Sequence, residues 1–408
     1  MHLGIKFCPP DHTRGGSQHT QAANLIRAIH AAHPEVVVFS SHEGFSEIDG
    51  LRVEAIPNPL SRASLAGKAA AYFYEQLTFE HRLRAGGCDV LLCPFNSESL
   101  LWTGGVPQVL IVRDLIPLVF PEHFPITAWM WRLLFIPAIR KARAVITVSK
   151  HTRADLLRIL GIPAEKVWVV PNGYHPVADR VAAGSPDGFL PFILYVSSSH
   201  YPYKNILGLL EAYRGLKQDF PHRLVVVGQP VPRFSPAIHA AVERLGLQDS
   251  VRLLRNLSDQ ELAGLYQRAE LFVYPTLYEG FGMPPLEAMS CGVPVVASNR
   301  TSVPEVCGDA ALYVDPYQPE EIRRGMAEAL RNTELRSDLI RRGLARAAQF
   351  DWMRTARAIV EICRQVTGGG AGPEDQPRAG AGESGRGAEP QADEAAQPPP
   401  TAAGPGAR

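Results

Sequence analysis

From Leu3 to Val170 the chain alternates short apolar runs with longer amphipathic segments. The apolar runs are brief and rich in β-branched residues, which predicts buried strands at LGIKFC, EVVVFS, DVLLCP, PQVLIV and AVITVS. Between them, apolar residues recur at helical spacing in segments such as QAANLIRAIHAAH and KHTRADLLRIL. Because neighbouring parallel strands need crossover connections, this alternation predicts a parallel sheet covered by helices.

A second series of the same kind follows a tract interrupted by proline and glycine. Its apolar runs predict strands at FILYV, HRLVVVG, SVRLL, ELFVYP and VPVVAS. Helical spacing is found in NILGLLEAYRGL, SDQELAGLYQRA, PPLEAMSC, EEIRRGMAEALR, ELRSDLIRRGLARAA and DWMRTARAIVEICRQV. The repetition of one α/β pattern predicts two domains of similar architecture.

These patterns divide the chain of 408 residues into five parts. From residue 368 onwards the sequence has no large apolar side chain, so this Pro/Gly/Ala-rich segment is predicted to be disordered. The predicted parts are a first Rossmann-like domain at 1–173, a linker at 174–188, a second Rossmann-like domain at 189–350, a C-terminal helix at 351–367 and a tail at 368–408.

Charge and cysteine content exclude several classes of protein. Basic and acidic residues each number 41, so no overall electrostatic attraction to nucleic acid is expected. The six cysteines are scattered, which argues against a zinc site or a disulfide framework and favours a reducing compartment. We see no signal peptide pattern and no apolar run long enough to span a membrane, so we expect a cytoplasmic protein.

The stretch with most chemical information runs from Tyr278 to Val306, YEGFGMPPLEAMSCGVPVVASNRTSVPEV. An apolar run before this stretch predicts a strand that ends at Pro275. The stretch itself then predicts a glycine-rich turn that carries Glu279 and a helix opened by two prolines. Glu287 then lies inside the helix, about one turn beyond its start. The backbone N–H groups at such a helix start form a site for phosphate or sugar oxygens.

This stretch resembles the signature of glycosyltransferase family 4, two glutamates separated by seven residues within EGFG-x-P-x-x-E-A. The resemblance continues to about Val366 and includes, in order, Gly15-Gly16, VRDLIPLVFPEHF, VSKHTRADL, VPNG, Lys204-Asn205 and LYQRAELFVYPTLYEGFG. It implies the GT-B fold, in which two Rossmann-like, doubly wound α/β domains face each other across a cleft. It also implies transfer of a hexose from a nucleoside-diphosphate sugar, with retention and without a metal ion.

The resemblance assigns roles to residues around that cleft. Glu279 is implied to face the transferred sugar as a catalytic group, and Glu287 to accept hydrogen bonds from the ribose hydroxyls. Lys204 is implied to neutralise the departing diphosphate, where Gly15 and Gly16 let the backbone approach. Donor oxygens are implied to bind the backbone N–H groups of Phe281, Gly282 and Met283.

Two positions depart from the family pattern. Ser199 stands five residues before Lys204, where members commonly have arginine, so either its hydroxyl serves at the donor phosphates or charge compensation comes from elsewhere. Arg113 stands where many members have histidine, and it is a candidate contact for the acceptor or the phosphate. The adjacent Asp114 is either a catalytic group on the acceptor side or a loop carboxylate.

Other chemistries find no support in the sequence. No P-loop, zinc-protease, hydrolase-elbow or dinucleotide fingerprint occurs, and no Asp-x-Asp pair suggests a metal-dependent transferase. No cofactor is therefore expected beyond a donor substrate, for which GDP- or dTDP-linked mannose and rhamnose are candidates by family analogy. The expected acceptor is a saccharide or a lipid-linked saccharide.

Several alternatives remain open. The same fold supports nucleotide-sugar epimerases and phosphorylases, and the departures at Arg113 and Ser199 leave room for a catalytically degenerate scaffold subunit. The stretch TAWMWRLLFIPAIRKAR mixes aromatic and basic residues, which predicts either a packed amphipathic helix or a peripheral membrane contact.

Overall fold

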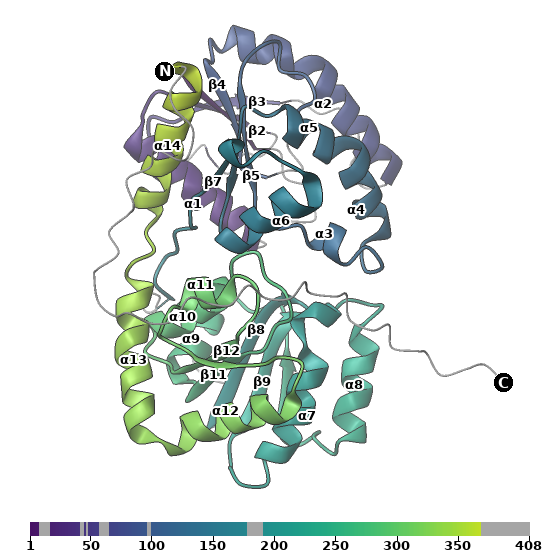
Figure 1. Ribbon diagram of the computed structural model, residues 1–408, viewed down its shortest axis with the longest axis vertical. Helices are drawn as coiled ribbons and strands as arrows, with labels where there is room; N and C mark the ends of the chain where they lie inside the picture. The colour runs from purple at the N-terminus through teal and green to yellow at the C-terminus, as the bar shows by residue number, and fades with distance from the viewer. Residues whose placement is uncertain are drawn as a thin grey trace, which may run out of the picture. The chain divides into compact units, whose positions relative to one another are not determined.

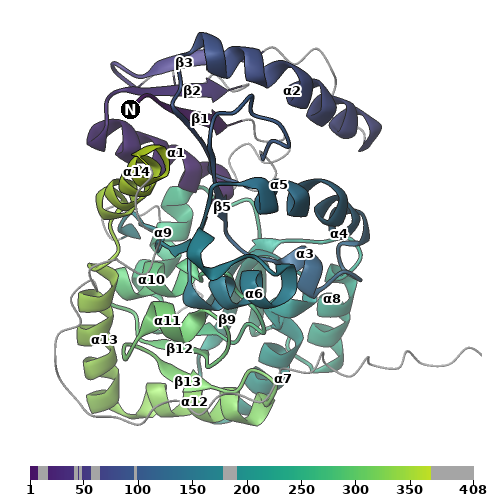
Figure 2. The same ribbon diagram turned by 45° about the horizontal axis from the view of Figure 1, so that its top comes forward.

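The computed structural model describes residues 1–7, 17–40, 45, 48–56, 65–95, 99–177 and 191–368. The chain divides into a compact unit, Met1–Pro373, and a second unit, Glu374–Arg408. Two parallel sheets, each covered by helices, make up the first unit (Figures 1 and 2). Gly15, Gly16, most of the predicted linker and the predicted tail beyond residue 368 lie outside the described residues.

The first sheet has seven strands in the order β3-β2-β1-β4-β5-β6-β7. Alternate residues of its strands face opposite helix layers: Ile5 and Val38 belong to one core, Val37 and Leu91 to the other. The strands are β1 Leu3–Phe7, β2 Val36–Ser40, β3 Arg52–Ala55, β4 Val90–Cys93, β5 Gln108–Val112, β6 Ala144–Thr147 and β7 Val167–Val169. The helices are α1 Ser17–Ala32, α2 Leu65–Ala85, α3 Ile116–Val119, α4 Pro125–Met130, a π-helical turn Trp131–Phe135, α5 Ile136–Lys141 and α6 Lys150–Leu160.

The second sheet has six strands in the order β10-β9-β8-β11-β12-β13. Its strands are β8 Phe192–Ser199, β9 Arg223–Gln229, β10 Val251–Leu254, β11 Leu271–Tyr274, β12 Val295–Ser298 and β13 Leu312–Val314. Its helices are α7 Ile206–Leu216, α8 Ser235–Arg244, α9 Asp259–Arg268, α10 Met283–Ser290, α11 Val303–Cys307, α12 Pro319–Arg331 and α13 Thr333–Ala347. The strand order reverses between β8 and β11, which creates a topological switch point.

The last helix, α14 (Trp352–Gly368), lies beside α1 on the first sheet (Figures 1 and 2). Ile359 and Cys363 of α14 are buried in the same core as strands of the first sheet. The chain approaches α14 closely at Gly173, because a Cβ atom there would lie 2.4 Å from the backbone nitrogen of Trp352. Thr355 Oγ1 also donates a hydrogen bond to the carbonyl of Pro171, at 2.9 Å. The C-terminal helix is therefore an integral part of the first sheet's helix layer.

Among the described helices, none combines the length and apolar character that crossing a membrane requires.

Candidate functional site

The switch point of the second sheet brings the two central residues of the site together. Lys204 follows β8 and Glu279 follows β11, and these strands are neighbours. Lys204 Nζ lies 2.7 Å from Glu279 Oε1, and each residue is only 6% exposed. A parallel sheet places the carboxyl ends of adjacent strands at one edge, which is where α/β proteins bind ligands.

The loop that carries Lys204 is fixed to the rest of the site by hydrogen bonds. Residues Pro202–Lys204 form one 3₁₀ turn, and Asn205 then takes a left-handed conformation with φ of 58°. The Asn205 amide donates to the carbonyls of Pro275 (2.9 Å) and Pro316 (2.7 Å). The backbone N–H of Leu277 donates to the carbonyl of Tyr203 at 2.8 Å. The lysine loop and the glutamate turn are thus bonded to each other directly.

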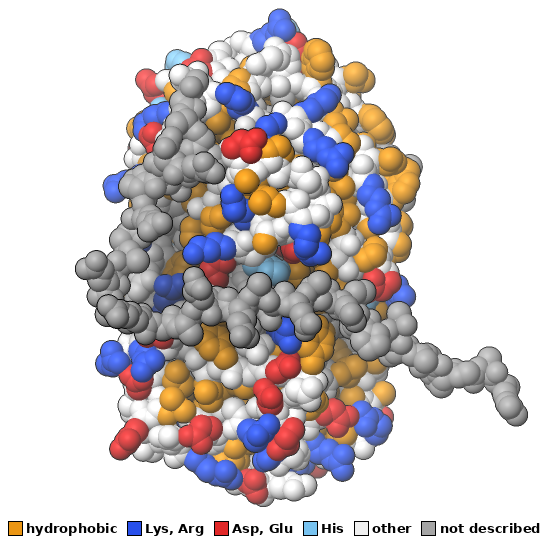
Figure 3. Space-filling model, viewed as in Figure 1, with side chains coloured by type: hydrophobic (Ala, Val, Ile, Leu, Met, Phe, Trp, Pro, Cys, Tyr) orange, Lys and Arg blue, Asp and Glu red, His pale blue; other side chains and the backbone are white. Residues whose placement is uncertain are grey.

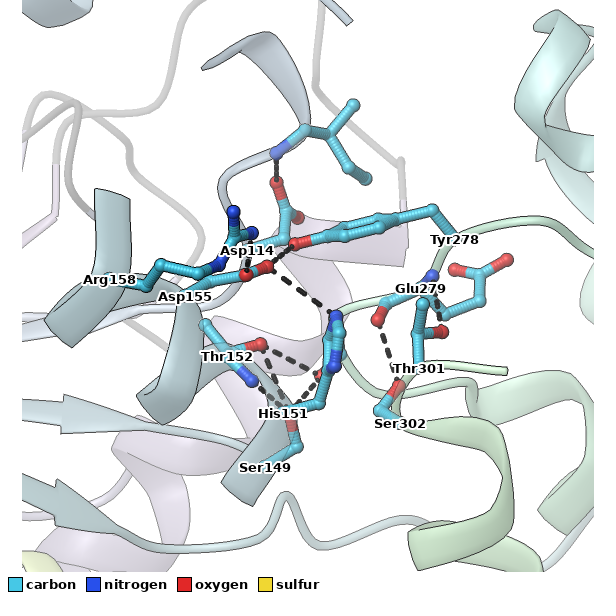
Figure 4. Close-up of polar contacts among 12 residues, drawn as sticks. Asp114, Ser149, His151, Thr152, Asp155, Arg158, Tyr278, Glu279, Thr301 and Ser302 are labelled. Atoms are coloured by element: carbon cyan, nitrogen blue, oxygen red, sulfur yellow. Dashed lines mark hydrogen bonds and ion pairs between the residues drawn. The ribbon is translucent and has the colours of Figure 1, made fainter. Parts of the chain in front are cut away.

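The turn that carries Glu279 is held by hydroxyl groups from the segment after β12. Thr301 Oγ1 accepts from the backbone N–H of Glu279 at 3.1 Å, and Ser302 Oγ donates to the carbonyl of Glu279 at 2.9 Å (Figure 4). Ser302 Oγ also donates to the carbonyl of Phe281 at 2.9 Å. The turn ends at Gly282, whose φ of 97° is accessible to glycine and which precedes α10. Glu279 thus sits in a glycine-rich turn before a helix start, as the sequence predicts.

Gly280 brings this turn against the first sheet. A Cβ atom at Gly280 would lie 2.2 Å from the carbonyl oxygen of Arg113, so only glycine fits. The carbonyl of Gly280 accepts hydrogen bonds from Ser149 Oγ (2.7 Å) and Thr152 Oγ1 (3.3 Å), both at the start of α6 (Figure 4). Ser149 also accepts from the N–H of Thr152, so one hydroxyl caps α6 and binds the turn.

A second cluster joins the same turn to α6. Tyr278 donates to Asp155 Oδ2 at 2.6 Å, while Arg158 lies 2.7 Å from Asp155 Oδ1 and His151 lies 3.4 Å from Oδ2 (Figure 4). Burial, followed by the charge of Asp155, raises the pKa of Tyr278, so it remains a donor. Burial lowers the pKa of His151, against the opposing effect of Asp155. Glu279 directs its carboxylate away from this cluster (Figure 4).

Asp114 follows β5 and lies near the Lys204–Glu279 pair. Its Oδ1 accepts from the backbone N–H of Ile116 at 3.0 Å. Burial raises the pKa of Asp114, and the charge of Glu279 adds to this effect, while the Ile116 N–H and the charges of Lys204 and Arg113 oppose it. Asp114 also lies against the turn that carries Glu279, since a Cβ atom at Gly280 would lie 2.8 Å from Cβ of Asp114.

The side chain of the neighbouring Arg113 contacts residues on the helix and loops around the first sheet. Its Nη1 donates to Gln21 Oε1 at 2.6 Å and to Asn172 Oδ1 at 3.2 Å. The guanidinium lies over the ring of Phe95, 4.9 Å from the centroid. These contacts hold Arg113 beside the loop that carries Asp114.

The remaining predicted residues lie around this centre. Glu287 is half-buried on α10 and accepts from Tyr266 at 2.7 Å. Phe281, Gly282 and Met283 form the end of the turn and the start of α10. Ser199 ends β8 beyond an irregularity in its pairing with β9, and its carbonyl accepts from Ser197. The structure thus brings Lys204, Glu279 and Asp114 together, with the other described candidates on adjoining segments.

Sequence reasoning missed the groups that hold the centre in place. Tyr274 donates to Glu279 Oε1 at 2.7 Å, and Tyr195 donates to the carbonyl of Lys204 at 2.9 Å. Both occur in apolar runs that predict strands, where a tyrosine gives no signal of its own. Ser149 falls in a segment that resembles the family, but nothing in the sequence links it to Gly280.

Within the described part of the chain, no three His, Cys, Asp or Glu side chains are grouped closely enough to hold a metal ion.

Comparison with known proteins agrees with this architecture. Residues 15–177 match the family described as Glycosyltransferase Family 4, and residues 186–346 match the family described as Glycosyl transferases group 1. O-antigen chain mannosyltransferase B of Escherichia coli is 36% identical over 227 residues, which cover 53% of this chain and 58% of that protein. O-antigen chain mannosyltransferase RfbU of Salmonella typhimurium is 26% identical over 323 residues, 78% of this chain and 86% of that protein.

A solved structure shows the same fold. Anabaena HepE, in complex with UDP and glucose, has a TM-score of 0.69 and 20% identity, and the match covers 89% of this chain and all of that one. The chain spans little more than half the length of the E. coli relative named above. The chain has two parallel sheets with a candidate site at the switch point of the second, and a glycosyltransferase family model matches each of its halves. It therefore has the GT-B fold and contains a Glycosyltransferase Family 4 region followed by a Glycosyl transferases group 1 region.

Proposed function

We propose that this protein transfers a hexose, with mannose as the first candidate, from a nucleoside-diphosphate sugar to a saccharide or lipid-linked saccharide. The observation that carries the proposal is the buried Lys204–Glu279 pair at the switch point, beside the start of α10. The O-antigen mannosyltransferases of E. coli and S. typhimurium support mannose and a polysaccharide acceptor. The complex of HepE with UDP and glucose supports a nucleotide-linked donor.

The chemistry of the proposed reaction is electrostatic. As the bond between the anomeric carbon and the diphosphate breaks, positive charge develops on the sugar and negative charge on the leaving group. Glu279 is placed to stabilise the first charge. Lys204 and the backbone N–H groups at the start of α10 are placed to stabilise the second. Fixed groups in a buried site cost little reorganisation during the reaction, which is why burial of the pair favours this role.

Asp114 has the position of a group on the acceptor side. Asp114 follows a strand of the first sheet, whereas Lys204 and Glu279, which we assign to the donor sugar, follow strands of the second. The raised pKa of Asp114 suits a carboxyl that receives a proton. The proposal includes retention of anomeric configuration and no requirement for a metal ion. Nuclear magnetic resonance of the product tests the first, and assays with and without EDTA test the second.

The central test replaces Glu279 by Gln, which keeps the size and the acceptor oxygen but removes the charge. A thermal-shift screen of GDP, UDP, ADP, dTDP and their sugars first identifies the donor; a nucleotide at one hundred times its Kd adds about 2.7 kcal/mol of stability. With that donor, Glu279→Gln is expected to lower transfer at least a hundredfold. The control Glu328→Gln changes a carboxylate that accepts from Asn332 on the surface.

The outcomes separate the candidate functions. Loss of transfer in Glu279→Gln with unchanged nucleotide binding supports the proposal. Near-normal transfer would refute the role of Glu279. Conversion of the donor to an isomer without an acceptor would identify an epimerase, and nucleotide binding without any turnover would identify a scaffold subunit.

We further propose that the first sheet contacts an anionic membrane surface, where a lipid-linked acceptor would lie. Ile126, Trp129 and Leu133 follow one another at helical spacing and are each at least half exposed. Figure 3 shows hydrophobic and basic side chains together where Figure 1 places α2 and α4. Aromatic and apolar side chains next to basic ones suit the interface of a bilayer that carries negative charge. Further exposed members of this apolar and basic surface are Phe73, Leu77, Trp102, Arg132, Arg140 and Lys141.

A further inference from the structure

Two buried tyrosines stand on the neighbouring central strands of the second sheet. Tyr195 on β8 is 0% exposed and Tyr274 on β11 is 1% exposed, and their rings stack with centroids 6.2 Å apart. Each hydroxyl donates to one half of the switch-point pair: Tyr195 to the carbonyl of Lys204, and Tyr274 to the carboxylate of Glu279. The two strands therefore each supply one phenol, which holds the backbone of Lys204 in one case and the side chain of Glu279 in the other.

We propose that Tyr274 is a positioning residue that fixes Glu279 Oε1, so that Oε2 remains for the transferred sugar, and that it keeps this bond when Lys204 turns to the diphosphate. This inference rests on the proposed function, because it assigns a role relative to a donor sugar. It adds a residue that the sequence did not indicate.

The geometry gives the two donors different tasks. Lys204 Nζ and Tyr274 OH both lie 2.7 Å from the same oxygen, Oε1, and neither of these bonds uses Oε2. A diphosphate close to Lys204 competes for its ammonium group, since the phosphates carry more charge than one carboxylate. Tyr274 comes from a buried strand and has no comparable freedom to move. Its bond is therefore the one that persists through the reaction.

The phenol is suited to a permanent donor. Burial raises the pKa of Tyr274 well above its ordinary value, and the charge of Glu279 adds to this effect. The hydroxyl thus keeps its proton at neutral pH. A phenol that stays protonated donates a hydrogen bond to the ionised carboxylate and so stabilises the negative charge of that group.

A purely structural hydroxyl on α7, a helix packed in the core of the second sheet, serves as a comparison. Tyr213 is also 0% exposed, and its hydroxyl donates to the carbonyls of His222 and Ser250. Its acceptors are neutral backbone groups remote from the switch point. Replacing either Tyr213 or Tyr274 by Phe removes one buried donor and keeps the ring, so the two variants differ in the charge of the acceptor.

The first experiment needs no substrate: thermal unfolding of Tyr274→Phe, Tyr213→Phe and wild type at pH 7. A hydrogen bond to a carboxylate contributes more to stability than one to a neutral carbonyl. We therefore expect Tyr274→Phe to lower the Tm by more than Tyr213→Phe does.

The second experiment follows nucleotide release from GDP-mannose, or from the donor that the thermal-shift screen identifies. We expect kcat of Tyr274→Phe to fall about tenfold. Nucleoside-diphosphate affinity should stay within about twofold of wild type, because the hydroxyl of Tyr274 donates to Glu279 and not to Lys204. Tyr195→Phe, which removes one of the hydrogen bonds that hold the lysine loop, should instead weaken nucleoside-diphosphate binding.

Each outcome supports or overturns the assignment. A Tm loss in Tyr274→Phe no larger than that of Tyr213→Phe would show that the phenol does not hold the ionised carboxylate. A larger Tm loss with unchanged kcat would reduce Tyr274 to a structural residue. Full activity of Glu279→Gln would refute the proposed function instead, while the unfolding data would still test the bond.

Discussion

Replacing Gly280 by Ala tests whether the turn that carries Glu279 is held against the first sheet. The added Cβ would lie 2.2 Å from the carbonyl oxygen of Arg113 and 2.8 Å from Cβ of Asp114. The nearer atom belongs to the backbone, so no side-chain rotation relieves the overlap. An ordinary contact between these atoms needs over 3 Å, so the turn must move by about 1 Å.

The size of the effect follows from what this movement breaks. The carbonyl of Gly280 accepts from Ser149 and Thr152, and each hydrogen bond contributes about 1 kcal/mol. We expect Gly280→Ala to lower the free energy of unfolding by about 2 kcal/mol. Glu279 is the adjacent residue, and a displacement of about 1 Å in a reacting group costs roughly a hundredfold in rate.

The assay combines initial transfer rates with urea unfolding. Gly368→Ala is a matched control, since a Cβ at Gly368 meets no atom within 4 Å. Ser149→Ala removes the shorter of the two bonds without any overlap and also removes the cap of α6, so it should cost about 2 kcal/mol with less than a tenfold loss of rate. A Gly280→Ala variant as stable and active as wild type would show that the turn is not held against Arg113.

Two further predictions concern the first sheet. Asp114→Asn keeps the acceptor for the Ile116 N–H. Because burial raises the pKa of Asp114, ionisation of this carboxyl destabilises the folded state at pH values above the raised pKa, and it has no such effect below the ordinary pKa of 3.8. The variant should therefore have a higher Tm than wild type at pH 7, a smaller difference near pH 4, and lower transfer activity; a lower Tm at pH 7 would contradict the pKa shift. Replacing Trp129 and Leu133 by Ser should reduce sedimentation with phosphatidylglycerol vesicles at least tenfold, whereas Leu344→Ser on α13, also exposed, should not; equal binding would place the membrane contact elsewhere.

Much of the fold could be predicted because its strands are buried on both faces. Runs such as EVVVFS and AVITVS contain the whole of β2 and β6, and the helix that carries Glu287 begins within two residues of its predicted start. The strand β3 was missed because RVEA is half exposed at the edge of the sheet and has no apolar run. The short β7 and β13 were missed for a related reason, since three residues give too little pattern.

The candidate site could be predicted only in part. The glycines and prolines around Glu279 report a local turn, and local geometry is what a sequence pattern encodes. The bond between Lys204 and Glu279 joins residues 75 apart in the chain, and only the strand order brings them together. A tyrosine inside a strand, such as Tyr274, looks the same in the sequence whether its hydroxyl donates to a backbone carbonyl or to the carboxylate of Glu279.

The position of Glu279 depends on buried hydroxyl groups from several segments. Ser149 and Ser302 are each 0% exposed and bond to the carbonyls of the turn, while Tyr274 bonds to the carboxylate itself. A buried hydroxyl that loses its partner is costly, so each of these groups opposes any movement of the turn. Because Ser149 also caps α6, one hydroxyl links the start of a helix on the first sheet to the turn that carries Glu279 on the second. The site is therefore expected to lose precision before the protein loses its fold.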